Sequence, residues 1–209
     1  MLIQIPADLT IVTLRSGTQT HPQRFTTEYA QRLLTEASGI LESRANIKFT
    51  RGECTSVTEE MPPGMRADVI DDQGFHFLAA RFRAGQGVRV LFVDRLARDE
   101  IGGRAREEKK FTIVPYNRDV PSTARKLAHE LGHLLGHTGH VNDGFTPDPG
   151  NENEWSRFSR NLMFSGSLNP DALLTPNQIA AMRSSRLARQ FGGTSIGDMF
   201  IPEILRNLR

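Results

Sequence analysis

One segment of this chain constrains its fold more than any other, the run from Pro121 to Gly136. Apolar residues recur in it at helical spacing, and the terminating glycine follows them directly. His129 and His133 are four residues apart, so their imidazoles leave one face of such a helix, with Cβ atoms about 5–6 Å apart. The leucines lie on a different side of it: Leu127, Leu131, Leu134 and Leu135. The sequence therefore predicts a helix that buries one side and presents two histidines on another.

The two histidines have the spacing of a zinc site. Two imidazole nitrogens at this separation can bind one zinc ion at Zn–N distances of about 2.0–2.1 Å. Glu130 is rotated by about 100° from His129, which is too far for a third ligand but suits a base beside water on the metal. The alternative is a surface or core pair of histidines without metal. The clustering of His137 and His140 just beyond the helix favours metal binding.

These residues also resemble a known family. The run HELGHLLG from His129 to Gly136, followed closely by a further histidine, is similar to the active-site motif of the metzincin metallopeptidases. Asn161-Leu162-Met163 resembles the methionine turn beneath the zinc of that family. Residues 174–179 (LTPNQI) resemble the start of its C-terminal helix, and the segments VRVLFV and FTIV resemble the strands before its active-site helix.

The resemblance implies both a fold and a cofactor. The fold is α+β, a metzincin-like zincin domain with a twisted mixed β-sheet, an active-site helix and a C-terminal helix. The cofactor is zinc (Zn2+), held by His129, His133 and a third histidine that returns after the turn at Gly136, with Met163 as a support beneath the metal. The order of the segments agrees with this class, because strand-like segments come first and helical ones last.

The third ligand departs from the family pattern. That pattern places it six residues after the second histidine, where this chain has Gly139. His140 is one position later, and a glycine-containing turn absorbs an extra residue easily, so His140 is the expected ligand. His137 directly follows the helix-ending glycine, which leaves little chain for a return to the metal. In a gluzincin-type alternative the ligand is a downstream glutamate, and Glu152 and Glu154 lie at about the right distance for it.

The other segments predict the layout around this site. Strands are expected over residues 9–14, 45–54, 88–93 and 111–116, and helices over residues 26–41 and from about residue 175. Residues 75–82 fit a helix or a strand. Pro115 cannot donate to a strand ladder, so residues 111–116 are expected at a sheet edge. A charged loop with Gly102 and Gly103 precedes them.

Length and composition limit the partners. The chain has 209 residues, predicted as a catalytic domain over 1–190 and a C-terminal tail or short packed helix over 191–209. The net charge is only +2, with bases and acids interleaved, so nucleic acid is not an expected partner. No apolar run approaches the roughly 18 residues of a membrane helix, and the single Cys54 excludes an internal disulfide. The N-terminus lacks a signal-peptide pattern, so we expect a cytoplasmic protein or one exported by a non-classical route.

The expected activity is hydrolysis of peptide bonds, with an endopeptidase favoured. Zinc would lower the pKa of its bound water to about 7, and Glu130 would move the proton from that water to the leaving amine. A protein or peptide substrate would add as a strand along residues 111–116. Some metzincins have a tyrosine just after the methionine turn, where this chain has Phe164 and Ser165. Two other functions stay open, a zinc-binding interaction module without turnover and a toxin-like peptidase whose partner is a protein inhibitor.

Overall fold

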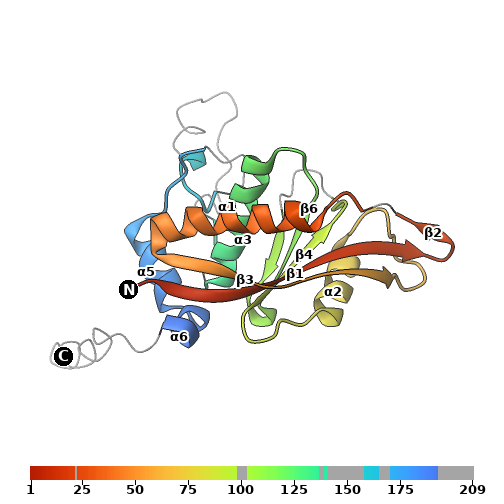
Figure 1. Ribbon diagram of the computed structural model, residues 1–209, viewed down its shortest axis with the longest axis horizontal. Helices are drawn as coiled ribbons and strands as arrows, with labels where there is room; N and C mark the ends of the chain where they lie inside the picture. The colour runs from red at the N-terminus through yellow and green to blue at the C-terminus, as the bar shows by residue number, and fades with distance from the viewer. Residues whose placement is uncertain (22, 98–102, 137–138, 141–157, 165–169, 193–209) are drawn as a thin grey trace.

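The fold is α+β, built on a six-stranded mixed sheet in the order β2-β1-β4-β6-β5, with β3 paired to β1 (Figure 1). A computed structural model describes residues 1–21, 23–97, 103–136, 139–140, 158–164 and 170–192. The strands are β1 (Ile3–Ser16), β2 (Gln19–Thr20), β3 (Ile47–Glu60), β4 (Val88–Val93), β5 (Arg104–Arg106) and β6 (Phe111–Pro115). The helices are α1 (Thr27–Ala45), α2 (Asp72–Arg81), α3 (Val120–Leu134), α5 (Pro176–Ser184) and α6 (Arg186–Gly192), with a 3-10 turn, η1 (Glu107–Lys109).

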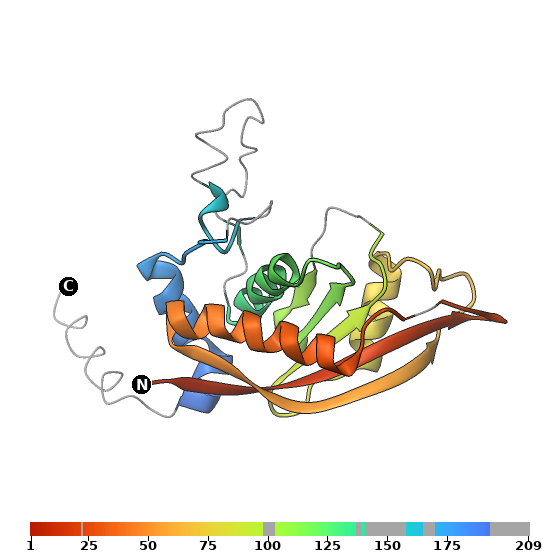
Figure 2. The same cartoon turned by 45° about the horizontal axis from the view of Figure 1, so that its top comes forward.

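The central strands are parallel and covered on both faces. β1 runs parallel to β3 and β4, and β4 runs parallel to β6. Alternate side chains of β4 enter different cores: Val90 and Phe92 pack with α1 and α3, whereas Leu91 and Val93 pack with α2. This double coverage explains why four consecutive apolar residues, Val90 to Val93, occur in this strand. Figure 2 shows α1 lying along β1 and β3.

The prediction that residues 111–116 form an edge strand is wrong. β6 lies between β4 and β5, and the edge of the sheet is β5, which pairs antiparallel with β6 through Arg104–Ile113 and Arg106–Phe111. Among the described residues, the pairing of β5 with β6 extends only to Ile113, so no described strand residue lies opposite Pro115 on that side. A proline at the last residue of a strand therefore costs the ladder nothing, although the strand is internal.

The helices largely follow the predictions from periodicity. The helix predicted over residues 26–41 continues to Ala45 and ends at Asn46, whose φ of 58° is left-handed. The ambiguous residues 75–82 belong to a helix, α2, which Asp71 caps by accepting a hydrogen bond from the Gly74 N–H at 2.8 Å. The helix predicted from about residue 175 begins at Pro176, with a capping box between Thr175 and Gln178.

The predicted C-terminal tail lies mostly outside the described residues, which end at Gly192 in α6. The division at residue 190 therefore stays a prediction. Within the described ranges, no helix combines the length and the apolarity that crossing a bilayer requires.

Candidate metal centre

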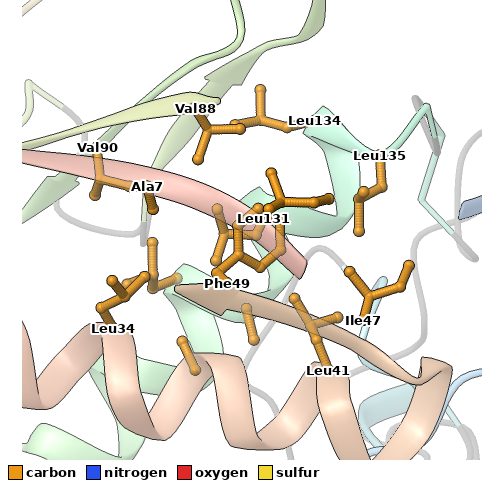
Figure 3. Close-up of a cluster of buried hydrophobic side chains, with 14 of the residues drawn as sticks. Ala7, Leu34, Leu41, Ile47, Phe49, Val88, Val90, Leu131, Leu134 and Leu135 are labelled. Atoms are coloured by element: carbon orange, nitrogen blue, oxygen red, sulfur yellow. The ribbon is translucent and has the colours of Figure 1, made fainter. Parts of the chain in front are cut away.

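Helix α3 carries the two histidines of the motif. Asp119 caps its first turn by accepting a hydrogen bond from the Ser122 N–H at 3.1 Å, and Pro121 occupies that turn, where no N–H is needed. At the other end Gly136 has a φ of +81°, a conformation that glycine adopts without a Cβ penalty. Figure 3 shows the stripe of Leu131, Leu134 and Leu135 among side chains of the sheet and α1. The leucines of α3 therefore pack in the core, and the side of the helix that bears the histidines faces the candidate site.

Three imidazoles converge beside α3. The Nε2 atom of His133 lies 3.0 Å from Nε2 of His129 and 3.2 Å from Nε2 of His140. A proton on His133 Nε2 can form a hydrogen bond to only one of the other two nitrogens. A metal cation placed among the three nitrogens can bind all three. Two nitrogens bound to one tetrahedral zinc at about 2.0–2.1 Å would lie about 3.3–3.4 Å apart. The three side chains can therefore hold one metal ion.

A backbone carbonyl fixes the orientation of His129. Its Nδ1 atom lies 2.7 Å from the carbonyl oxygen of Leu162, and the histidine is 7% exposed. A carbonyl only accepts hydrogen bonds, so Nδ1 carries the proton and the Nε2 lone pair points to the other imidazoles. This is the tautomer that a metal-binding histidine with a carbonyl partner adopts.

Glu130 is buried next to the three imidazoles. It is 7% exposed, and burial raises the pKa of its carboxyl to about 8, while the positive charge of Arg104 acts in the opposite direction. A cation at the histidines would also favour the charged carboxylate, because opposite charges stabilise each other. The side chain of Glu130 occupies the space that a side chain of Gly103 would fill: a Cβ there would lie 2.7 Å from Glu130 Cγ and 3.0 Å from the Ile113 oxygen.

The segment around Met163 lies directly under α3. Met163 is fully buried, and a Cβ on Gly132 would lie 2.7 Å from its sulfur and 3.0 Å from Cε of Met182. Gly132 stands between the two histidines of α3, so the glycine lets both methionines approach the helix at that level. The residue after it, Phe164, is 2% exposed and packs as an apolar side chain.

The structure brings together His129, His133 and His140, with Glu130 beside them. The alternative ligands His137, Glu152 and Glu154 lie outside the described residues. Two residues near the site had no assigned role in the sequence: Gly103, read only as part of a loop, lies against Glu130, and Gln178, read only as part of a helix start, is hydrogen-bonded to Asn161. Their roles depend on contacts between distant segments, for which no local spacing gives a signal.

Comparisons with known proteins bear on the fold. No family model matches the sequence, and no curated protein matches it either. The structure is similar to the crystal structure of archaemetzincin from Methanopyrus kandleri, with a TM-score of 0.56 over 86% of this chain and 94% of that chain. The fold is that of a metzincin-like zincin. The two sequences are 11% identical, so the likeness concerns the fold, and the chemistry must be argued from the side chains.

Proposed function

We propose that this protein is a zinc-dependent peptidase of the metzincin type, with an endopeptidase favoured. The observation that carries the proposal is the convergence of three imidazole Nε2 atoms next to a buried glutamate on the same helix. A metzincin-like fold makes such a site credible, because the similar structure has its chain arranged in the same way.

The donor set fits zinc. Imidazole nitrogens are preferred zinc ligands, and three of them leave one tetrahedral position open, as catalytic zinc sites do and structural sites do not. His129, His133 and His140 would hold the ion. When bound, zinc supplies Lewis acidity, which activates water and stabilises negative charge on a carbonyl oxygen.

Glu130 is the proposed general base. Glu130 directly follows His129, a proposed ligand, in α3. Its side chain lies against Gly103, the residue before the edge strand β5. None of the described residues donates a hydrogen bond to its carboxylate, so the oxygens can accept one from a water molecule. Glu130 would take the proton of the attacking water and pass it to the leaving amine nitrogen, a transfer worth about 10²–10⁴-fold in rate.

A peptide substrate would pair with the edge strand. Among the described strands the edge of the sheet on this side is β5 rather than residues 111–116, because β6 is paired on both sides. Gly103 precedes β5 directly and contacts the side chain of Glu130, so a strand laid along β5 leads to the proposed base. Main-chain hydrogen bonds to an edge strand bind peptides of varied sequence.

Metal content and peptide hydrolysis, measured on three proteins, test the proposal. We expect one zinc per chain in the wild type, by mass spectrometry, together with cleavage of a mixed peptide substrate. Glu130→Gln should keep the zinc and lose activity by about 100-fold or more, because only the proton transfer is removed. His140→Ala should lose most of the zinc.

Each other result has a defined meaning. Full activity in Glu130→Gln would refute the role of Glu130. Zinc retained at wild-type affinity in His140→Ala would assign the third position to another residue. Zinc bound by a wild type that cleaves no peptide would favour an interaction module without turnover.

A further inference from the structure

Two side-chain amides, one partly buried (Asn161) and one buried (Gln178), connect the segment around Met163 with helix α5. Asn161 Nδ2 donates to Gln178 Oε1 at 3.1 Å, and Gln178 Nε2 donates to Asn161 Oδ1, also at 3.1 Å. Gln178 is only 6% exposed, and its Oε1 also accepts the Thr175 N–H at 2.8 Å. The reciprocal pair is thus built into the first turn of α5, where Gln178 completes the capping box.

Hydrogen bonds of Asn161 also fix the backbone on both sides of Leu162, whose carbonyl contacts His129. Asn161 Oδ1 also accepts the N–H of Met163 at 2.9 Å, and the Asn161 carbonyl accepts the N–H of Phe164 at 3.1 Å. Leu162 lies between these bonds, and its own N–H donates to the Leu173 carbonyl at 2.7 Å. The Leu162 carbonyl is therefore held from both sides, and it is the partner of His129 Nδ1 at 2.7 Å.

We propose that Asn161 and Gln178 are positioning residues for the metal ligand His129. They hold the Leu162 carbonyl at the place where it sets the ring orientation and the tautomer of that histidine. The inference rests on the proposed metal site. It goes beyond it by assigning the orientation of His129 to a side chain on α5, a different helix from α3, which bears His129 and His133.

The burial of Gln178 and the partial burial of Asn161 make the loss of either partner costly. An amide that loses its partner inside a protein keeps its desolvation cost, so the remaining side chain and the backbone around it shift to find a new partner. Replacing Gln178 removes the acceptor of Asn161 Nδ2 and leaves Asn161 Oδ1 with only the Met163 N–H as a donor. Partners of metal-bound histidines typically change metal affinity by about 10- to 100-fold when they are lost.

The test uses zinc affinity, measured by competition with a chromogenic chelator, in variants of the full chain. We expect Gln178→Ala and Asn161→Ala each to weaken zinc binding by about 10-fold or more. The double variant should be no weaker than the single ones, because the two amides act as one unit. The matched control is Thr175→Ala, which removes the hydroxyl that caps the same helix turn (3.3 Å from the Gln178 N–H) and leaves the amide pair in place. The control should destabilise α5 and change zinc affinity by less than about 3-fold.

A conservative variant covers the case in which the alanine variants do not fold. Gln178→Glu keeps the acceptor of the capping box but sets a carboxylate oxygen against Asn161 Oδ1, which cannot donate to it, so it should fold and still bind zinc as weakly as Gln178→Ala. The absorption spectrum of the cobalt-substituted proteins should change in the amide variants and stay unchanged in Thr175→Ala, because the ring orientation of one ligand differs.

The outcomes separate this inference from the proposed function. If zinc affinity falls equally in the amide variants and in Thr175→Ala, Asn161 and Gln178 only stabilise the fold and the inference is overturned. A wild type that binds zinc without cleaving peptides would overturn the peptidase and leave the positioning role intact. A wild type that binds no zinc would overturn both, before any variant is needed.

Discussion

Replacing Gly103 by alanine tests how closely the edge strand and the proposed base fit together. The new Cβ would lie 2.7 Å from Glu130 Cγ, 3.2 Å from Glu130 Cδ and 3.0 Å from the Ile113 carbonyl oxygen. The last atom belongs to the paired strand β6, which the sheet holds in place, so Glu130 has to yield. An ordinary contact begins at 3.4 Å, so Cγ must retreat by about 0.7 Å (3.4 minus 2.7).

That displacement sets the expected magnitude. A misplacement of about 1 Å can cost on the order of 100-fold in rate, so we expect kcat/KM to fall by about 10- to 100-fold in Gly103→Ala. Overpacking should also lower the stability by about 1–3 kcal/mol. Zinc content should not change, because the atoms nearest to the new Cβ belong to Glu130 and Ile113 and not to a histidine.

The assay compares Gly103→Ala with Gly85→Ala. A Cβ on Gly85 would meet only Asp8 Oδ2, at 3.8 Å, and neither glycine has a left-handed φ. Peptide hydrolysis, zinc content and thermal unfolding are measured on both. Wild-type kcat/KM in Gly103→Ala would refute the reasoning, because the base would then tolerate the shift. Loss of zinc in that variant would show that the change acts on the ligands instead.

Two further predictions concern α3 itself. Gly132→Ala gains about 1 kcal/mol of helix propensity but presses on the ends of Met163 and Met182, so it should be less stable than Gly39→Ala, whose Cβ meets no atom within 4 Å in α1; equal unfolding temperatures would contradict the packing of Met163 on the helix. Gly136→Ala puts a Cβ on a residue with φ of +81°, which should cost about 1–2 kcal/mol in chemical denaturation; an unchanged midpoint would contradict the left-handed turn.

The similarity to archaemetzincin concerns the fold. At 11% identity the shared feature is the arrangement of sheet and helices. The chemistry rests instead on the geometry of four side chains, His129, Glu130, His133 and His140, and on the partners that orient them. Variants are most informative at Gly103, which lies against Glu130, and at the proposed positioning residues Asn161 and Gln178.

The sequence alone determined the parts of the site that lie on one helix. Helical spacing places His129 and His133 on one side of α3 and its leucines on another, since side chains four residues apart share a face whatever surrounds them. The tertiary structure decided what depends on segments meeting across the fold. It brought His140 to the other two imidazoles, made β5 the edge in place of β6, and set Gly103 against Glu130 and Gln178 against Asn161. A three-residue strand such as β5 carries no periodic signal, and a contact between distant segments depends on packing that no local pattern contains.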